Sequence, residues 1–178
     1  MSDMLNKCFS PAKLNGLTLR NRIIKAGTFE GMTPGGVPSA RLIRHHEEVS
    51  RGGTGMTTVA YCAAEADGRV MEEMMYMNEG IRPQLEKLAA AVHSHGGALS
   101  GQLGHCGHFT QNREFQGKRP LGPSAHFNLS GVPYGTWWAG AMGTEDMNRQ
   151  VQVFHDAAKF MKSVGFDAIE IHFAHGYG

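Results

Sequence analysis

The run Met56-Thr-Thr-Val-Ala-Tyr-Cys62 points most directly to the architecture of this chain. It is short, rich in β-branched residues and free of strongly polar side chains, a pattern typical of a strand covered on both faces. Strands of this kind belong to parallel sheets, whose crossover connections place helices on the faces of the sheet. We therefore expect residues 56–62 to be a buried strand in an α/β domain.

Helical patterns flank this strand on both sides. Before it, Ser39 is suited to cap a helix whose apolar residues recur from Leu42 to Val49 and which ends at Gly52-Gly53. After it, apolar residues recur at steps of four, three and four between Ile81 and Val92, ahead of Gly96-Gly97. The strand is thus predicted to lie between two amphipathic helices.

Three further strands and a hairpin complete the pattern. The strands are expected at 23–26, 98–103 and 168–172, and Asn15-Gly16 predicts a hairpin before the first of them. Alternating strands and helices imply right-handed βαβ crossovers. Residues 1–178 are therefore interpreted as one domain, a hairpin followed by about four βα units. Both a small doubly wound sheet and the first half of an eight-stranded barrel fit this order.

The segment from Gly104 to Gly143 shows no periodicity and is rich in Gly, Pro, His and aromatic residues. Structureless segments of this length inside a domain are usually functional, so we interpret it as an active-site loop. Thr144 is predicted to cap the following helix, whose buried face is expected to include Met147, Val151, Phe154, Ala158 and Met161.

Composition excludes several classes of protein. The chain of 178 residues has 17 Lys+Arg against 16 Asp+Glu, so a net charge of +1 gives no indication of a nucleic-acid partner. No window reaches the roughly 18 apolar residues of a membrane span, and the first residues lack the apolar stretch of a signal peptide, so we expect a cytoplasmic protein. The three cysteines form no C-x-x-C pair, and no metal centre is predicted from them.

Polar residues gather where the predicted strands end, which is where α/β proteins place their chemistry. Gln102 ends one strand, where its buried amide needs partners that either the backbone or a bound heterocycle can supply. His172, His175 and Tyr177 follow the last strand. Two imidazoles and a phenol there can hold a substrate oxygen and donate a proton. The same side chains can instead bond to neighbouring backbone, or the two histidines can bind a metal.

Five motifs resemble the Old Yellow Enzyme family of FMN-dependent NAD(P)H oxidoreductases, especially its bacterial branch with dienoyl-CoA reductases, and they occur in the family's order. They are Asn21-Arg22-Ile23-Ile24, Arg51-Gly-Gly-Thr-Gly55, Gln102-Leu-Gly-His105-Cys-Gly107, Leu121-Gly-Pro-Ser124 and Gly165-Phe-Asp-Ala-Ile-Glu-Ile-His-Phe-Ala-His-Gly-Tyr177.

The resemblance implies a TIM (β/α)8 barrel of which this chain holds the amino-terminal half, with FMN across the carboxyl ends of the strands. It implies that the backbone of Ala26, Gly27 and Thr28 contacts the flavin, that Ala60 or Tyr61 flanks it, and that Gln102 binds its pyrimidine edge.

The resemblance further implies that His172 and His175 hold a substrate carbonyl oxygen and that Tyr177 donates the proton. Hydride then passes from NAD(P)H through FMN to the C=C bond of an α,β-unsaturated carbonyl compound.

Two features depart from the family pattern. Phe29 stands where many relatives carry a small polar or thiol residue near the flavin. The sequence also stops directly after the last motif, so we expect a truncated chain that lacks the phosphate-binding loops of the barrel and has weak or no activity alone. Two alternatives are a metal-dependent barrel hydrolase that uses His172 and His175, and a non-catalytic half-barrel that associates with itself.

Overall fold

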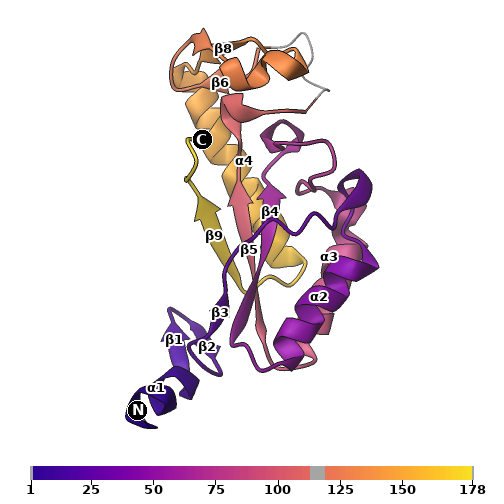
Figure 1. Ribbon diagram of the computed structural model, residues 1–178, viewed down its shortest axis with the longest axis vertical. Coiled ribbons are helices and arrows are strands. Elements are labelled where there is room, and N and C mark those ends of the chain that lie inside the picture. The colour runs from indigo at the N-terminus through magenta and orange to yellow at the C-terminus, as the bar shows by residue number, and fades with distance from the viewer. Residues whose placement is uncertain (1, 113–118, 178) are drawn as a thin grey trace.

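The computed structural model describes residues 2–112 and 119–177, and a four-stranded parallel sheet organises them (Figure 1). Its strands lie in the order β3 (Ile24–Lys25), β4 (Met56–Ala63), β5 (Ala98–Gly104) and β9 (Ala168–His172). All eight residues of β4 are buried, as the sequence predicts for this strand. The first strand is shorter than expected, since only two residues of 23–26 pair with β4.

Three helices pack with the sheet into one core. They are α2 (Ala40–Arg51), α3 (Arg82–His93) and α4 (Thr144–Ser163). Leu42 of α2, Leu85 of α3 and Met161 of α4 share a buried cluster with Val59 of β4 and Leu99 of β5. The predicted cap is present, because Ser39 Oγ accepts a hydrogen bond from the N–H of Leu42. The sheet with these helices is the predicted hairpin-plus-βα series, one α/β unit whose sheet is not closed into a barrel by the described residues.

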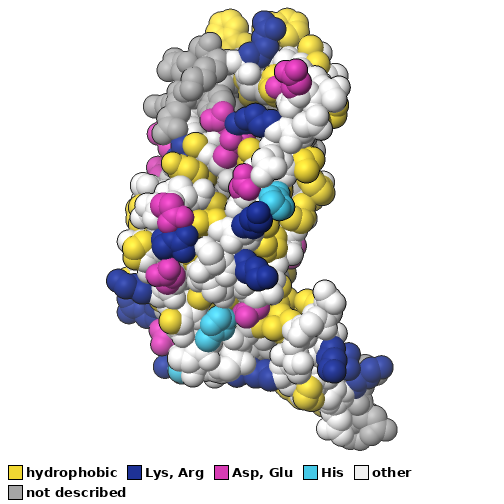
Figure 2. Space-filling model, turned by 180° about the vertical axis from the view of Figure 1, so that it is seen from behind, with side chains coloured by type: hydrophobic (Ala, Val, Ile, Leu, Met, Phe, Trp, Pro, Cys, Tyr) yellow, Lys and Arg dark blue, Asp and Glu magenta, His cyan; other side chains and the backbone are white. Residues whose placement is uncertain are grey.

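A small unit lies at the end of the sheet where the parallel strands begin (Figure 1). It contains the predicted hairpin, β1 (Ala12–Leu14) with β2 (Leu17–Leu19), and a helix α1 (Ser2–Phe9) that the sequence pattern did not indicate. Figure 2 shows this unit projecting from the body, and it shows acidic and basic side chains intermixed over the body on that side. In the part of the chain that the structure describes, no helix is long and apolar enough to span a bilayer.

The segment 104–143 is not the irregular loop that the sequence suggested. It holds a second sheet, in which β8 (Trp138–Ala141) pairs with β6 (Leu121–Gly122) and β7 (His126–Phe127). Two 3-10 turns, Gly107–Phe109 and Leu129–Tyr134, complete this unit, and residues 113–118 lie outside the described part. Strands of two residues are too short to show an alternating pattern, which explains why the prediction failed. Three other 3-10 turns lie outside this unit, at Pro34–Gly36, Ala66–Gly68 and Glu79–Ile81.

Two expectations for α4 were wrong. Gly143, not Thr144, is the N-cap, because its N–H donates to Asp146 Oδ2 at 2.8 Å. Met147 and Val151, expected on the buried face, are 50% and 72% exposed, whereas Met161 is fully buried. The apolar stripe of α4 thus extends past the edge of the four-stranded sheet, and only its second half is covered.

A buried polar cluster joins the end of β3 to β4 and α2. The carboxylate of Glu30 forms an ion pair with Lys25, and its Oε2 accepts the N–H of Ala60 at 3.2 Å. His46 is completely buried, with Nε2 3.5 Å from Glu30 Oε1 and Nδ1 2.7 Å from Thr57 Oγ1. Its spacing of four residues from Leu42 places both on the covered face of α2.

Burial and charge act on this cluster in a defined direction. Burial opposes the charge of Glu30, but hydrogen bonds from His46 and Lys25 outweigh it and hold the pKa of this carboxyl below its usual value. Burial lowers the pKa of His46, which the nearby carboxylate only partly offsets. Both groups therefore bind protons less readily in the folded chain than in the unfolded chain.

We expect the free energy of unfolding to fall as the pH drops below 6.5, the ordinary pKa of His46, and to fall further below 4.5, that of Glu30. The reason is that both groups have lowered pKa values in the folded state, so their contribution is present above those values and is lost in acid. Chemical unfolding at a series of pH values measures the slope. Glu30→Gln should lower the stability at pH 7 by about 1–3 kcal/mol and flatten the slope below 4.5. An unchanged slope in this variant would contradict the assignment.

Close packing of α4 on β5 gives a second prediction. A Cβ added at Gly101 would lie 2.1 Å from Met161 Cε and 2.8 Å from the ring of Phe166. Gly101→Ala should therefore destabilise the fold by about 1–3 kcal/mol. The matched control is Gly16→Ala in the hairpin, where a Cβ meets nothing within 4 Å. Equal unfolding midpoints for the two variants would show that α4 does not press on β5.

Candidate functional site

The carboxyl ends of β4, β5 and β9 lie at one end of the sheet, toward the unit formed by β6, β7 and β8 (Figure 1), and the chain after β3 runs in the same direction beside β4, where Phe29 pairs with Ala60. Because Gln102 and His172 lie on β5 and β9, which pair directly, the register brings the predicted residues of these strands to the same end. The residues singled out from the sequence therefore share one face of the molecule, and they form two groups.

The first group is built around Gly27 and Gln102. A Cβ at Gly27 would lie only 2.6 Å from Gln102 Nε2, so the glycine lets the amide lie against the backbone that follows β3. Gln102 Nε2 donates to Glu170 Oε1 at 2.6 Å, which gives the strand-end amide the partner it requires. Ala26 and Thr28 lie exposed on either side of Gly27. The result is an open backbone surface beside an amide side chain.

Ala60 and Tyr61 are the predicted site residues of β4, and they border both groups. Ala60 pairs with Phe29, and the peptide bond between Ala60 and Tyr61 is cis. Tyr61 is buried and its Oη donates to the carbonyl oxygen of Gly68 at 3.1 Å. Burial raises the pKa of Tyr61 far above its usual value, so this phenol stays neutral.

The second group contains the three predicted catalytic side chains. His172 Nε2 lies 3.1 Å from His175 Nδ1, and the ring of Tyr177 lies 5.4 Å and 5.6 Å from the two imidazoles. The ring of Tyr61 lies 6.0 Å from that of His172 and 6.1 Å from that of Tyr177. The structure thus brings together the two histidines and the two tyrosines.

Desolvation favours the uncharged forms of His172 and Tyr177. Burial lowers the pKa of His172, the neighbouring His175 lowers it further, and the carboxylate of Glu170 partly offsets both. Burial raises the pKa of Tyr177, so its hydroxyl keeps the proton that a donor needs. Glu170 connects the two groups, because the same carboxylate accepts from Gln102 and acts on His172.

Two residues of the site were missed by the sequence interpretation. The ring of Phe109 lies 5.8 Å from that of Tyr177, and Cys106 is a buried thiol whose pKa burial raises to about 12. Both belong to the segment after β5, which carries no periodic signal, so only the folded chain reveals their position. His105, from the same segment, lies with its Nε2 3.3 Å from Glu65 Oε1.

The possible metal site at His172 and His175 gains no further ligand. Among residues 2–112 and 119–177, the group of three potential ligands within metal-binding distance is Glu30, His45 and His46. Lys25 already neutralises Glu30 there, and Thr57 takes Nδ1 of His46.

Comparison with known proteins shows which family this chain resembles. Residues 7–178 match the NADH:flavin oxidoreductase / NADH oxidase family. The chain is 42% identical to the 4,4'-dithiodibutanoate disulfide reductase of Rhodococcus erythropolis over 171 residues, which are 95% of this chain and 41% of that protein. It is 29% identical to an NADPH dehydrogenase of Listeria monocytogenes, covering 97% of this chain and 50% of the relative.

Solved structures show the same fold. The Old Yellow Enzyme from Pichia sp. AKU4542 superimposes with a TM-score of 0.87 at 21% identity, over 96% of this chain and 47% of that one. Morphinone reductase in complex with tetrahydroNAD gives a TM-score of 0.83 at 24% identity, over 96% and 50%. The chain therefore spans about half, or less, of the length of these relatives, and its fold is the amino-terminal half of their (β/α)8 barrel. On this evidence the chain belongs to the NADH:flavin oxidoreductase / NADH oxidase family.

Proposed function

We propose that the protein carrying these residues is an FMN-dependent oxidoreductase of the ene-reductase type, which reduces the C=C bond of an α,β-unsaturated carbonyl compound at the expense of NAD(P)H. The observation that carries the proposal is the contact of His172, His175 and Tyr177 at the carboxyl ends of the strands. Family membership supports the flavin and the nicotinamide reductant.

The residues at the strand ends fit a flavin. The absence of a Cβ at Gly27 lets the Gln102 amide lie against this backbone, and that amide offers both a donor and an acceptor, as the pyrimidine edge of a flavin requires. The exposed backbone of Ala26, Gly27 and Thr28 would hold one edge of the ring system, and Ala60 with Tyr61 would lie against it. Bound FMN supplies the hydride that these side chains cannot provide.

The remaining chemistry belongs to the second group. With a substrate bound, His172 and His175 would each turn a ring N–H to the carbonyl oxygen, in place of the contact that their Nε2 and Nδ1 atoms make with each other, and stabilise the negative charge that develops there. The hydroxyl of Tyr177 would give its proton to the α carbon. Because the pKa of His172 is lowered and that of Tyr177 raised, both act as neutral donors.

A disulfide is the second candidate substrate, and the relative with 42% identity favours it, since its name is a 4,4'-dithiodibutanoate disulfide reductase. The same donors suit this reaction, because cleavage of an S–S bond leaves a thiolate that a neutral N–H or O–H can stabilise. Assays with an enone and with an aliphatic disulfide, each as the only oxidant, distinguish the two candidates.

Replacing His172 and His175 together by Ala should weaken the binding of a phenol such as p-hydroxybenzaldehyde by at least about tenfold, because the phenolate oxygen loses two donors. Titration followed by the flavin absorbance measures this affinity. The control is His155→Ala, an exposed histidine on α4 outside the site. Unchanged affinity in the double variant would contradict the proposal that these two histidines hold the oxygen of the ligand.

Tyr177→Phe should slow the half-reaction with the alkene by about 100-fold, the range of general acid catalysis, and leave reduction by NAD(P)H unaltered. Stopped-flow absorbance measures the two half-reactions separately. Tyr134→Phe, in the unit after β5, is the matched control. A similar loss in both half-reactions would reject Tyr177 as the proton donor.

A further inference from the structure

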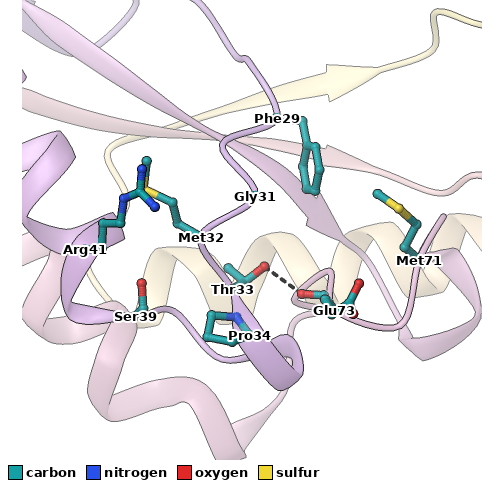
Figure 3. Close-up of a pocket in the computed structure, with 9 residues that line it drawn as sticks. All are labelled: Phe29, Gly31, Met32, Thr33, Pro34, Ser39, Arg41, Met71 and Glu73. Carbon is teal, nitrogen blue, oxygen red and sulfur yellow. Dashed lines mark hydrogen bonds between the residues drawn. The ribbon is translucent and has the colours of Figure 1, made fainter.

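A pocket of about 520 Å³ lies beside the end of β3, outside the group of catalytic side chains (Figure 3). Its apolar walls come from Phe29, Met32, Pro34 and Met71, and its charged side chains are Arg41 and Glu73. In the view of Figure 3, Arg41 and Met32 lie on one side of the pocket and Phe29 and Met71 on the other, with Glu73 below them. A roomy apolar pocket with two separate charges is typical of a site for a small amphipathic molecule.

Hydrogen bonds hold the segments that form the pocket. Thr33 Oγ1 donates to the carbonyl oxygen of Glu73 at 2.7 Å, which joins the loop after β3 to the segment after β4 (Figure 3). The N–H of Ser39 donates to the carbonyl oxygen of Met32 at 3.2 Å and fixes the start of α2 to the same loop. The pocket is therefore formed before any ligand enters, which reduces the entropic cost of binding.

The pocket adjoins the proposed flavin surface through two shared residues. Phe29 pairs with Ala60, and Met71 and Tyr177 both pack against the buried cluster that includes Ala60 and Tyr61. The pocket therefore borders the same cluster as the proposed proton donor, so a substrate that reaches this cluster has the pocket beside it. Phe29, which departs from the family pattern, is part of this wall rather than a polar group that acts on the flavin.

The charged side chains of the pocket indicate which chemical group lies at the far end of such a molecule. Among the residues that the structure describes, Arg41 forms no ion pair, so its guanidinium is available for a carboxylate, which it can hold through two parallel hydrogen bonds. Glu73 also lacks an ion pair there and repels a second negative charge. Methionine walls adapt to a flexible aliphatic chain better than to a rigid ring.

We propose that this pocket binds the aliphatic arm of the substrate, with a single terminal carboxylate on Arg41; in assigning the ligand to the substrate, the inference rests on the proposed function. Glu73 then disfavours an arm with two carboxylates, and Phe29 with Met71 contacts the methylene groups. The substrate class is accordingly an unsaturated carbonyl compound, or a disulfide, that carries an aliphatic acid.

The first test measures binding without turnover, on the intact flavoprotein. Octanoate should bind more tightly than octanamide. Arg41→Ala should lower the affinity for octanoate about fivefold and change the affinity for octanamide little, since one partly exposed ion pair is lost. Glu73→Gln should raise the affinity for octanoate, because it removes a negative charge that repels the carboxylate. The control is Arg44→Ala, which removes the same charge from the exposed side of α2. In NMR spectra with labelled methionine methyl groups, octanoate should shift Met32 and Met71.

Equal affinity for octanoate and octanamide, an equal loss in Arg44→Ala, or methyl shifts confined to other methionines would overturn the proposal. The second test compares turnover of an unsaturated keto acid and its methyl ester, where Arg41→Ala should lower kcat/KM for the acid about fivefold relative to the ester. If octanoate binding depends on Arg41 but no enone or disulfide is reduced, the pocket stands and the proposed function fails. If both substrates are reduced and Arg41→Ala affects them equally, the proposed function stands and the pocket assignment fails.

Discussion

The parallel pairing of β4 with β5 is the constraint on which the rest of the structure depends. Its register runs from Met56 opposite Ala98 to Ala63 opposite Gly104, with one irregularity between Val59 and Cys62. Parallel strands bring all their carboxyl ends to one edge, so this single pairing places Ala60 and Tyr61 beside Gln102, and through β9 beside His172. A shift of one residue would turn every side chain of β4 to the opposite face and separate the two groups of the site.

The buried ion pair of Lys25 and Glu30 depends on that pairing and also supports it. Glu30 leaves the line of β3, turns into the core and accepts the N–H of Ala60, the residue at which the β4–β5 register becomes irregular. A buried carboxylate costs free energy unless it is paired, and here Lys25, His46 and a backbone N–H share that role. The cluster is therefore better understood as a device that fixes the end of β4 than as a source of net stability.

The sequence predicts those parts of the fold in which one physical requirement dominates. The strands β4 and β9 follow from their composition, α2 from Ser39, and the positions of Gln102, His172, His175 and Tyr177 from the rule that strand ends carry polar groups. The rest depends on contacts that no local pattern records. Helical spacing places His46 on the covered face of α2 but does not show that Glu30 lies against it, and the short strands β6 to β8 form only through pairing with one another.

The apolar stripe of α4 is a second case in which the sequence pattern does not record the contacts of the folded chain. Met147, Val151 and Phe154 form a regular stripe with Met161, yet together with Ile171 and Phe173 of the β9 end they line a shallow, open apolar surface. The periodic pattern predicts which face of α4 is apolar, whereas the burial of that face depends on which other elements pack against it. The stripe therefore predicts a covered face correctly for Met161 and in part for Phe154 and Ala158, and it fails for Met147 and Val151.

Desolvation gives the candidate site its chemical character. Burial lowers the pKa of His172 and raises those of Tyr61 and Tyr177, so near neutral pH these three rings carry no net charge. Cationic imidazoles would bind an anion tightly before any reaction occurred and would favour the ground state. Neutral donors held by their neighbours bind a carbonyl oxygen weakly at first and more strongly as negative charge develops on it. In the proposed reaction, the burial that keeps His172 and Tyr177 neutral would let them stabilise the developing charge more than the bound ground state.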